Sequence, residues 1–128
     1  MKVICGGCFN KLHEGHKYFL KEAKKLGYLI VMIASDEMNK RKHGNKAIKI
    51  DARKRGVEEL KIADKILTGK KDRMEIVLKE KPDIIALGYD QEMPELSKES
   101  LKAIEEKINK KIKIVRIGKF QNGKRESW

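Results

Sequence analysis

The sequence predicts an α/β fold, a single doubly wound domain over residues 1–128 with a five-stranded parallel sheet. Two observations support this. Short apolar runs, typical of buried strands, alternate along the chain with stretches whose apolar residues recur at helical spacing. One run, YLIVMIA at Tyr28–Ala34, is apolar at every position, as a strand covered on both faces would be.

The first half of the chain predicts two strands, each followed by a helix. The first strand is Val3–Cys5, and Gly27 stands where a helix C-terminal glycine belongs. The helical stripe between them is Phe19, Ala23 and Leu26. A polar loop follows Ala34, and Asp51 is a good N-cap for the next helix. The apolar face of that helix comprises Val57, Leu60 and Ala63.

The second half predicts three more strands. Ile66 and Leu67 form a brief third strand, and the helix after it must stop before Pro82. The stripe of that helix is Met74, Val77 and Leu78. The fourth strand is Asp83–Leu87 and the fifth is Ile112–Ile117. The last helix, between these two strands, carries Leu101, Ile104 and Ile108.

Composition indicates an ordered globular protein with a heavily charged surface, since 40% of the 128 residues are hydrophobic and 39% are charged. No apolar run is long enough to cross a membrane, and the first residues lack the apolar core of a secretory signal peptide. Cys5 and Cys8 are too few and too close for a disulfide framework, which favours a reducing cytoplasm.

The net charge of +12 favours a polyanionic partner, either nucleic acid or a small phosphorylated molecule. A mixed Lys- and Glu-rich surface, common in thermophile proteins, is the alternative explanation for much of this charge. Two segments, 39–49 and 110–125, contain cations and no acid. Segregated charge of this kind indicates a partner.

The segments that follow the predicted strands converge on one edge of the sheet, where ligands of doubly wound folds bind. These segments are GGCFNKLHEGH, SDEMNKRKHGNK, GYDQ and GKFQNGKR. In the first of them, His13 and His16 open a helix whose free N–H groups and dipole attract anions. Gly6 and Gly7 allow close approach of a ligand, and Gly15 leaves room at the helix entrance. The pattern predicts a phosphate site.

Two other readings of the histidine pair stay open. Cys5, Cys8, His13 and His16 have the order of a zinc ligand set, but the spacing between the pairs is shorter than in zinc fingers. Each histidine could also be a satisfied polar group at a helix start. The sequence contains neither a P-loop nor a G-x-G-x-x-G motif, so kinase and dinucleotide-dehydrogenase functions lose their main support.

The segment GGCFNKLHEGH resembles the signature of the HxGH nucleotidyltransferase superfamily, in its cytidylyltransferase-like branch, where a G-x-F-D turn precedes H-x-G-H. Further segments resemble parts of bacterial glycerol-3-phosphate cytidylyltransferases and archaeal FAD synthases: FLKEAKKLG, SDEMNKRK, DARKRGVEELKIADKIL and KPDIIALGYDQ. The resemblance extends over most of the chain and implies a Rossmann-like domain.

The resemblance also implies a reaction, in which an acceptor phosphate attacks the α-phosphate of a nucleoside triphosphate and pyrophosphate leaves. His13 and His16 would bind the triphosphate and stabilise the pentavalent phosphorus, while Lys42 or Lys46 would clamp the phosphates. Mg²⁺ would enter with the nucleotide, and no resident metal site is expected. The implied nucleotide- and phosphate-binding residues are Gly6, Gly7, Cys8, Phe9, Asn10, Gly15, Arg53, Gly88, Asp90 and Arg116.

Some of these assignments have simpler alternatives. Arg53 could be a surface helix cation, and Asp90 a residue that caps its loop. Asn10 stands where the family usually has Asp, which puts metal or substrate handling by that carboxylate in doubt. The tail KFQNGKRESW also lacks the family's late Ser/Thr-rich motif.

The favoured activity is that of an FAD synthase, which transfers AMP from ATP to FMN. A glycerol-3-phosphate-type cytidylyltransferase that uses CTP is the alternative. A rival from another class is a basic nucleic-acid-binding protein that kept the fold and lost the chemistry. The resemblance further suggests a homodimer.

Overall fold

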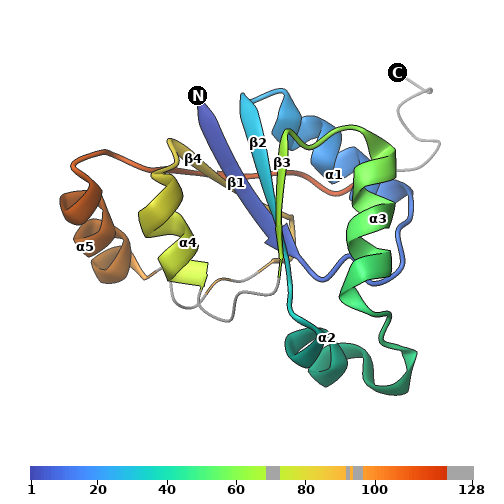
Figure 1. The fold of residues 1–128 in the computed structure, drawn as a ribbon. Helices are drawn as coiled ribbons and strands as arrows, with labels where there is room; N and C mark the ends of the chain where they lie inside the picture. The colour runs from blue at the N-terminus through green and yellow to red at the C-terminus, as the bar shows by residue number, and fades with distance from the viewer. Residues whose placement is uncertain (69–72, 92, 94–96, 121–128) are drawn as a thin grey trace.

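The computed structural model describes residues 1–68, 73–91, 93 and 97–120. Figure 1 shows a parallel sheet flanked by helices, which confirms the predicted fold class. In chain order the elements are β1 (Lys2–Gly7), α1 (Glu14–Lys24), β2 (Tyr28–Ile33), α2 (Asp36–His43), the 3₁₀ turn η1 (Gly44–Lys46), α3 (Ile50–Leu60), β3 (Lys65–Thr68), α4 (Arg73–Glu80), β4 (Ile84–Leu87), α5 (Lys98–Ile108) and β5 (Lys113–Arg116).

The strand order in the sheet is β3-β2-β1-β4-β5, and every neighbouring pair is parallel. The chain builds outward from β1 to β3, then crosses back to place β4 on the other side of β1. The order of strands therefore reverses between β1 and β4. A crevice is expected at this point, beyond the carboxyl ends of the strands.

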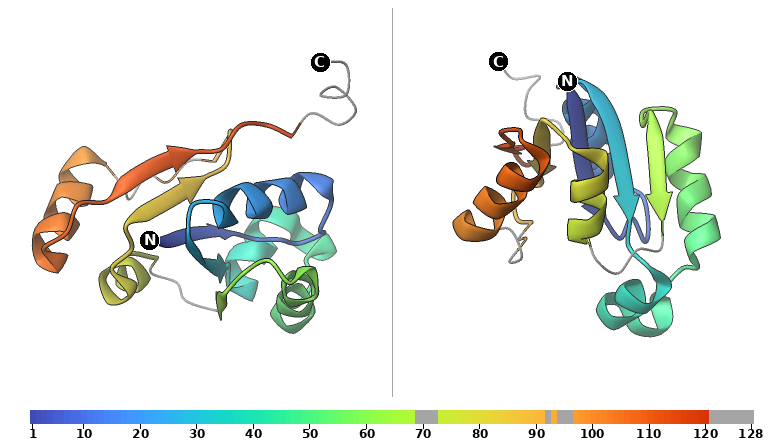
Figure 2. Two further views of the ribbon diagram at one scale, coloured as in Figure 1. Left: turned by 90° about the horizontal axis from the view of Figure 1, so that it is seen from above. Right: turned by 60° about the vertical axis from the view of Figure 1, so that its left-hand side comes forward.

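Alternate residues of the strands bury their side chains on opposite faces of the sheet. On one face, core residues of β1 and β2 pack with Leu20 and Ala23 of α1 and Val57 of α3. On the other face, Ile76 and Val77 of α4 and Ile104 of α5 complete the core. Figure 2 shows the sheet between these two helical layers. None of the helices in the described ranges is both long and apolar enough to cross a membrane.

The polar loop predicted after Ala34 is wrong, because residues 36–43 form helix α2. The Ser35 hydroxyl accepts a hydrogen bond from the Met38 N–H at 3.2 Å, which caps the helix. Acidic residues fill its first turn and basic residues its last, as the helix dipole favours. Only Asn39 is buried, so the helix has no apolar stripe from which its period could be read. In Figure 1, α2 lies beyond the carboxyl end of β2.

The start of α3 also differs from the prediction. The helix begins at Ile50 with Lys49 at the cap position, where no side chain caps it, and Asp51 lies in the first turn. The cap comes from another helix, since Asp36 Oδ1 accepts a hydrogen bond from the Ile50 N–H at 2.8 Å. A tertiary contact thus replaces the local one that the sequence suggested.

Candidate active site

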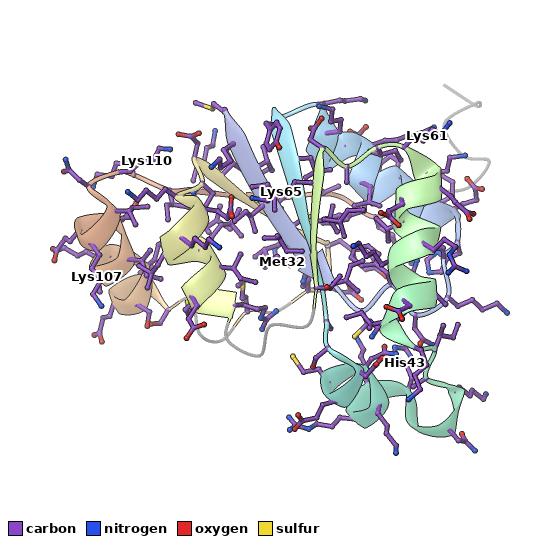
Figure 3. The ribbon with its side chains drawn as sticks, in the orientation of Figure 1. Met32, His43, Lys61, Lys65, Lys107 and Lys110 are labelled. Atoms are coloured by element: carbon purple, nitrogen blue, oxygen red, sulfur yellow. The ribbon has the colours of Figure 1, made fainter. Side chains whose placement is uncertain are left out.

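A cavity of about 1240 Å³ opens at the carboxyl ends of β1, β2 and β4, at the reversal of strand order. Twelve of the fourteen predicted site residues line it, and Arg53 and Arg116 do not. Figure 3 labels two further lining residues, Met32 near the end of β2 and His43 at the end of α2. Lys61 and Lys110, also labelled, lie toward the opposite end of the sheet. Part of the basic charge therefore lies away from the cavity.

The cavity wall is strongly cationic. Among the described residues that line it, Asp90 is the one acid. The lysines and arginines of the wall are Lys11, Lys42, Lys46, Arg73 and Lys119, and its histidines are His13, His16 and His43. A cavity with this balance of charge suits a polyanion.

The two histidines of the motif form a reciprocal cap at the start of α1. His13 is the N-cap residue, and its Nδ1 accepts a hydrogen bond from the Gly15 N–H at 3.0 Å. His16 Nδ1 accepts in turn from the His13 N–H at 3.3 Å. The rings stack with centroids 4.0 Å apart. Because each Nδ1 acts as an acceptor, the proton of each neutral ring is on Nε2, and each Nε2–H remains a donor.

His16 is held in its neutral form. Burial, followed by the positive fields of His13 and Lys42, lowers the pKa of His16 from 6.5 to about 4. The ring of Phe9, itself only 4% exposed, lies 5.5 Å from the His16 ring and contributes to that burial. At neutral pH His16 therefore offers an uncharged Nε2–H donor at the cavity wall.

Gly15 is required by the stacked ring of His13. A Cβ atom at Gly15 would lie 2.8 Å from Cε1 and 3.0 Å from Nδ1 of that imidazole. Any side chain here would displace the His13 ring from its capping position. The glycine of the motif thus serves the geometry of the histidine before it.

Lys42 at the end of α2 and Lys46 in η1 both line the cavity. Asn10 links this segment to the turn after β1. Its Nδ2 donates to the Lys46 carbonyl at 3.1 Å, and its Oδ1 accepts from the Ile48 N–H at 2.8 Å. Asn10 therefore contacts the lysine segment directly, in addition to lining the cavity.

The structure places Arg53 behind the cavity wall, as a buried brace 2% exposed. Its Nη1 donates to the carbonyls of Cys8 at 2.9 Å and Ala34 at 2.8 Å. Nε donates to the Ile48 carbonyl at 2.8 Å, and Nη2 pairs with Asp36 Oδ1 at 3.0 Å. The arrangement joins the ends of β1 and β2 to α2 and α3. Neither the predicted phosphate contact nor the surface-cation alternative fits this geometry.

Arg116 has a similar bracing role on the other side of the reversal. Its Nη1 donates to the carbonyls of Gly88 and Gln91, at 2.7 and 2.8 Å, across the turn that carries Asp90. Gln91 adds a contact that the sequence did not suggest. Its Oε1 accepts from the Gly88 N–H at 3.1 Å, and its Nε2 donates to the Gly6 carbonyl at 3.0 Å. The amide thus bridges β1 and β4 at the crevice.

The zinc reading receives no support from the geometry. Cys5 is 1% exposed in the sheet core, and burial raises the pKa of its thiol to about 12. Within the described ranges, no three His, Cys, Asp or Glu side chains converge to hold a metal ion. A thiol that stays protonated in an apolar core behaves as a small hydrophobe.

Comparison with known proteins identifies the family. The model of the family described as cytidylyltransferase-like matches residues 4–122. The chain belongs to the cytidylyltransferase-like family. Two curated relatives of this family member are FAD synthases. The one from Thermoplasma volcanium is 39% identical over 94% of this chain and 84% of its own length. The one from Aciduliprofundum boonei is 40% identical over 94% of this chain and 80% of its own length.

Solved structures agree with this assignment. A crystal structure described as the lipopolysaccharide core biosynthesis protein from Thermoplasma volcanium matches this cytidylyltransferase-like chain with a TM-score of 0.79 and 36% identity, over 94% of this chain and 98% of that one. A protein of unknown function from Archaeoglobus fulgidus shares the fold, with a TM-score of 0.67 and 22% identity. The family and the nucleotidyltransferase class that the sequence predicted are confirmed.

Proposed function

We propose that this nucleotidyltransferase is an FAD synthase, which transfers AMP from ATP to FMN and releases pyrophosphate. The observation that carries the choice of substrates is the identity of about 39% to archaeal FAD synthases over 94% of the chain. The cationic cavity at the strand reversal supports the same reaction, since both substrates and the leaving group carry phosphate.

In the proposed reaction, a phosphate oxygen of FMN attacks the α-phosphorus of ATP. A new P–O bond forms, and the bond from the α-phosphorus to the β-bridging oxygen breaks, so that pyrophosphate leaves with the electron pair. No side chain becomes covalently attached. Nε2–H of His13 and His16 donates to the phosphate oxygens on which charge develops, and Lys42 and Lys46 neutralise the remaining charge.

Two apolar regions of the cavity suit the two ring systems of these substrates. Tyr18, Phe19 and Phe120 line one region, where the rings of Tyr18 and Phe120 have centroids 5.4 Å apart. The other region is formed by Met32, Leu67 and Ile76 on the opposite face of the sheet. A base and an isoalloxazine ring could each occupy one region, with their phosphates meeting at the histidines between.

The divalent ion of the reaction, which we take to be Mg²⁺, would be carried in on the triphosphate oxygens. Asp90 is the single carboxylate among the described lining residues, too few for a metal site built by the protein alone. When bound, the ion would neutralise charge on the leaving pyrophosphate. Chelation with EDTA should therefore abolish pyrophosphate release without lowering the melting temperature of the protein.

The test is a substrate panel in which ATP and CTP are each paired with FMN and with glycerol 3-phosphate, and pyrophosphate release is measured with and without Mg²⁺. We expect release only with ATP and FMN, and FAD as the product. Tight binding of CTP with no response to FMN would instead establish the glycerol-3-phosphate-type alternative. We further propose a cytoplasmic location, because Cys5 and Cys8 are both free thiols. The homodimer that the resemblance suggests stays a prediction, which analytical ultracentrifugation can test.

A further inference from the structure

The side-chain amides of Asn10 and Asn39 hold the segment that carries Lys46. Asn10 receives hydrogen bonds at Oδ1 from the Ile48 N–H and from Asn39 Nδ2, each at 2.8 Å, and donates from Nδ2 to the Lys46 carbonyl. Asn39 Nδ2 also donates to the Ile48 carbonyl at 3.2 Å. The backbone on both sides of Ala47 is thus fixed by side chains from β1's turn and from α2.

The orientation of both amides follows from this network. The Ile48 N–H needs an acceptor, so Asn10 must present Oδ1 to it and Nδ2 to the Lys46 carbonyl. Asn39 must then present Nδ2 to Asn10 Oδ1 and to the Ile48 carbonyl. Its own Oδ1 is left buried without a partner among the described residues, although Asn39 is 0% exposed. A buried amide that leaves one atom unsatisfied is costly to the fold, so the two hydrogen bonds from Asn39 Nδ2 are what hold it in this orientation.

A carboxylate at either position could not make these contacts. Aspartate has no N–H to donate, so at position 10 it would place an oxygen against the Lys46 carbonyl. It would also add negative charge beside the cavity wall that Lys42 and Lys46 line. The neutral pair keeps the segment in place and leaves the positive field of the cavity undiminished.

We infer that Asn10 and Asn39 form an amide clasp that positions Lys46 for the triphosphate, so that both act as positioning residues; this inference rests on the proposed function. Asn39 does not line the cavity, so its effect on a ligand must pass through the segment it holds. Arg53 holds the Ile48 carbonyl from the other side. The backbone on both sides of Ala47 is thereby held in place, and with it the position of Lys46.

The first experiment is a double-mutant cycle between Asn39 and Lys46, measured as binding of inorganic triphosphate by titration calorimetry. The substitution is Asn39→Leu, which matches the size of the amide. It removes the unsatisfied Oδ1 and the Nδ2 group that donates to Asn10 and to the Ile48 carbonyl. We expect it to weaken binding roughly tenfold, the scale of a charged hydrogen bond lost, while the stability of the fold is kept or raised. In a Lys46→Ala background the same change should cost less than about twofold.

Equal losses from Asn39→Leu in the two backgrounds would overturn the inference, as would undiminished binding in the single variant. Loss of stability in parallel with binding would show a merely structural role and overturn it too. Asn45→Ala is the matched control, because Asn45 is an exposed amide beside Lys46 that takes no part in the clasp. We expect this variant to bind triphosphate as the unaltered protein does.

A second measurement separates failure of the clasp from failure of the proposed function. Amide hydrogen exchange at Ile48 reports the clasp in the free protein, whatever the substrate. Replacing Asn10 with Ala removes the acceptor of that N–H and should speed its exchange about tenfold, while Asn45→Ala leaves it unchanged. Unchanged exchange in Asn10→Ala would overturn the clasp even if the protein makes FAD. Faster exchange in a protein that binds no triphosphate would uphold the contact and overturn both Lys46 positioning and the proposed function.

Discussion

In the proposed site, His13 and His16 would recognise a polyanion through direction more than through charge. Each ring accepts at Nδ1 from a backbone N–H of α1, so the Nε2–H of its neutral form is a fixed donor. The same two side chains therefore cap the helix and line the cavity, where we propose that they face the ligand. Substitutions at these residues should affect catalysis far more than folding.

His16→Ala should lower kcat/KM for pyrophosphate release by about 100-fold or more, the scale of removing one donor to a developing charge. The lost cap should cost only about 1 kcal/mol of unfolding free energy. His16→Gln is the matched control, since its amide nitrogen can lie near the position of Nε2, and it should retain part of the activity. Undiminished turnover in His16→Ala would contradict the assignment.

The pKa of His16 predicts a dependence of stability on pH. Its folded value of about 4 lies below the ordinary value of 6.5, so the unfolded chain takes up a proton first as the pH falls. His16 therefore lowers the unfolding free energy between pH 6.5 and about 4, and adds no further loss below that. Urea unfolding of His16→Gln across this range should show a flatter pH profile. An identical profile would place the His16 pKa near its ordinary value.

Gly15→Ala should separate helix stability from site geometry. Alanine is favoured over glycine within a helix by up to about 1 kcal/mol, which should offset the roughly 1 kcal/mol lost with the displaced His13 cap. Its Cβ would, however, meet the His13 ring at 2.8 Å. We expect a large fall in kcat/KM with the melting temperature kept, and full activity in this variant would show that the His13 position is unimportant.

At the scale of the elements, the hydrogen bonds of Arg53 behind the cavity hold the ends of β1 and β2 in place. Arg53→Ala would leave the buried carbonyls of Cys8 and Ala34 without donors and should cost about 3 kcal/mol of unfolding free energy. Arg55→Ala, an exposed arginine on the same helix, is the control and should cost less than about 0.5 kcal/mol. If Arg53→Ala raised KM for ATP and left stability unchanged, the result would contradict the bracing role and support a direct contact between Arg53 and phosphate.

The elements that the sequence predicted are those with an apolar period. Strands such as β1, β2 and β4 and helices such as 50–60 bury a stripe or a face, and that burial is visible as spacing. Helix α2 could not be found this way, because it buries an amide instead of apolar residues. Its signal was local chemistry: Ser35 before two acids, and four basic residues at the end.

Site residues could be predicted from the sequence where local type and spacing mark them, and not where their role depends on long-range contacts. The glycines and histidines of the site could be predicted from their type and spacing, because they lie in a turn that follows a strand. Asn39 and Gln91 act through contacts across 29 and 85 positions of sequence, and nothing near them in the chain indicates those partners. The resemblance assigns Arg53 to a phosphate contact, whereas its place in the structure depends on the packing of α2 against α3, which buries it.

At the scale of the whole molecule, the fold brings the ends of β1 and β4 together at the reversal of strand order. The resulting cavity collects cations that lie far apart in the sequence, from Lys11 to Lys119. This arrangement concentrates part of the excess positive charge in a cavity that suits a small polyanion. It also predicts that triphosphate binding weakens with rising salt, as for any charged site that water can reach.

The most direct test of the account is a crystal structure of the protein soaked with a non-hydrolysable analogue of ATP. We predict that the triphosphate lies within hydrogen-bond distance of Nε2 of His13 and His16, with the ammonium groups of Lys42 and Lys46 on its other side. A nucleotide bound elsewhere, with the start of α1 left empty or occupied by zinc, would contradict it.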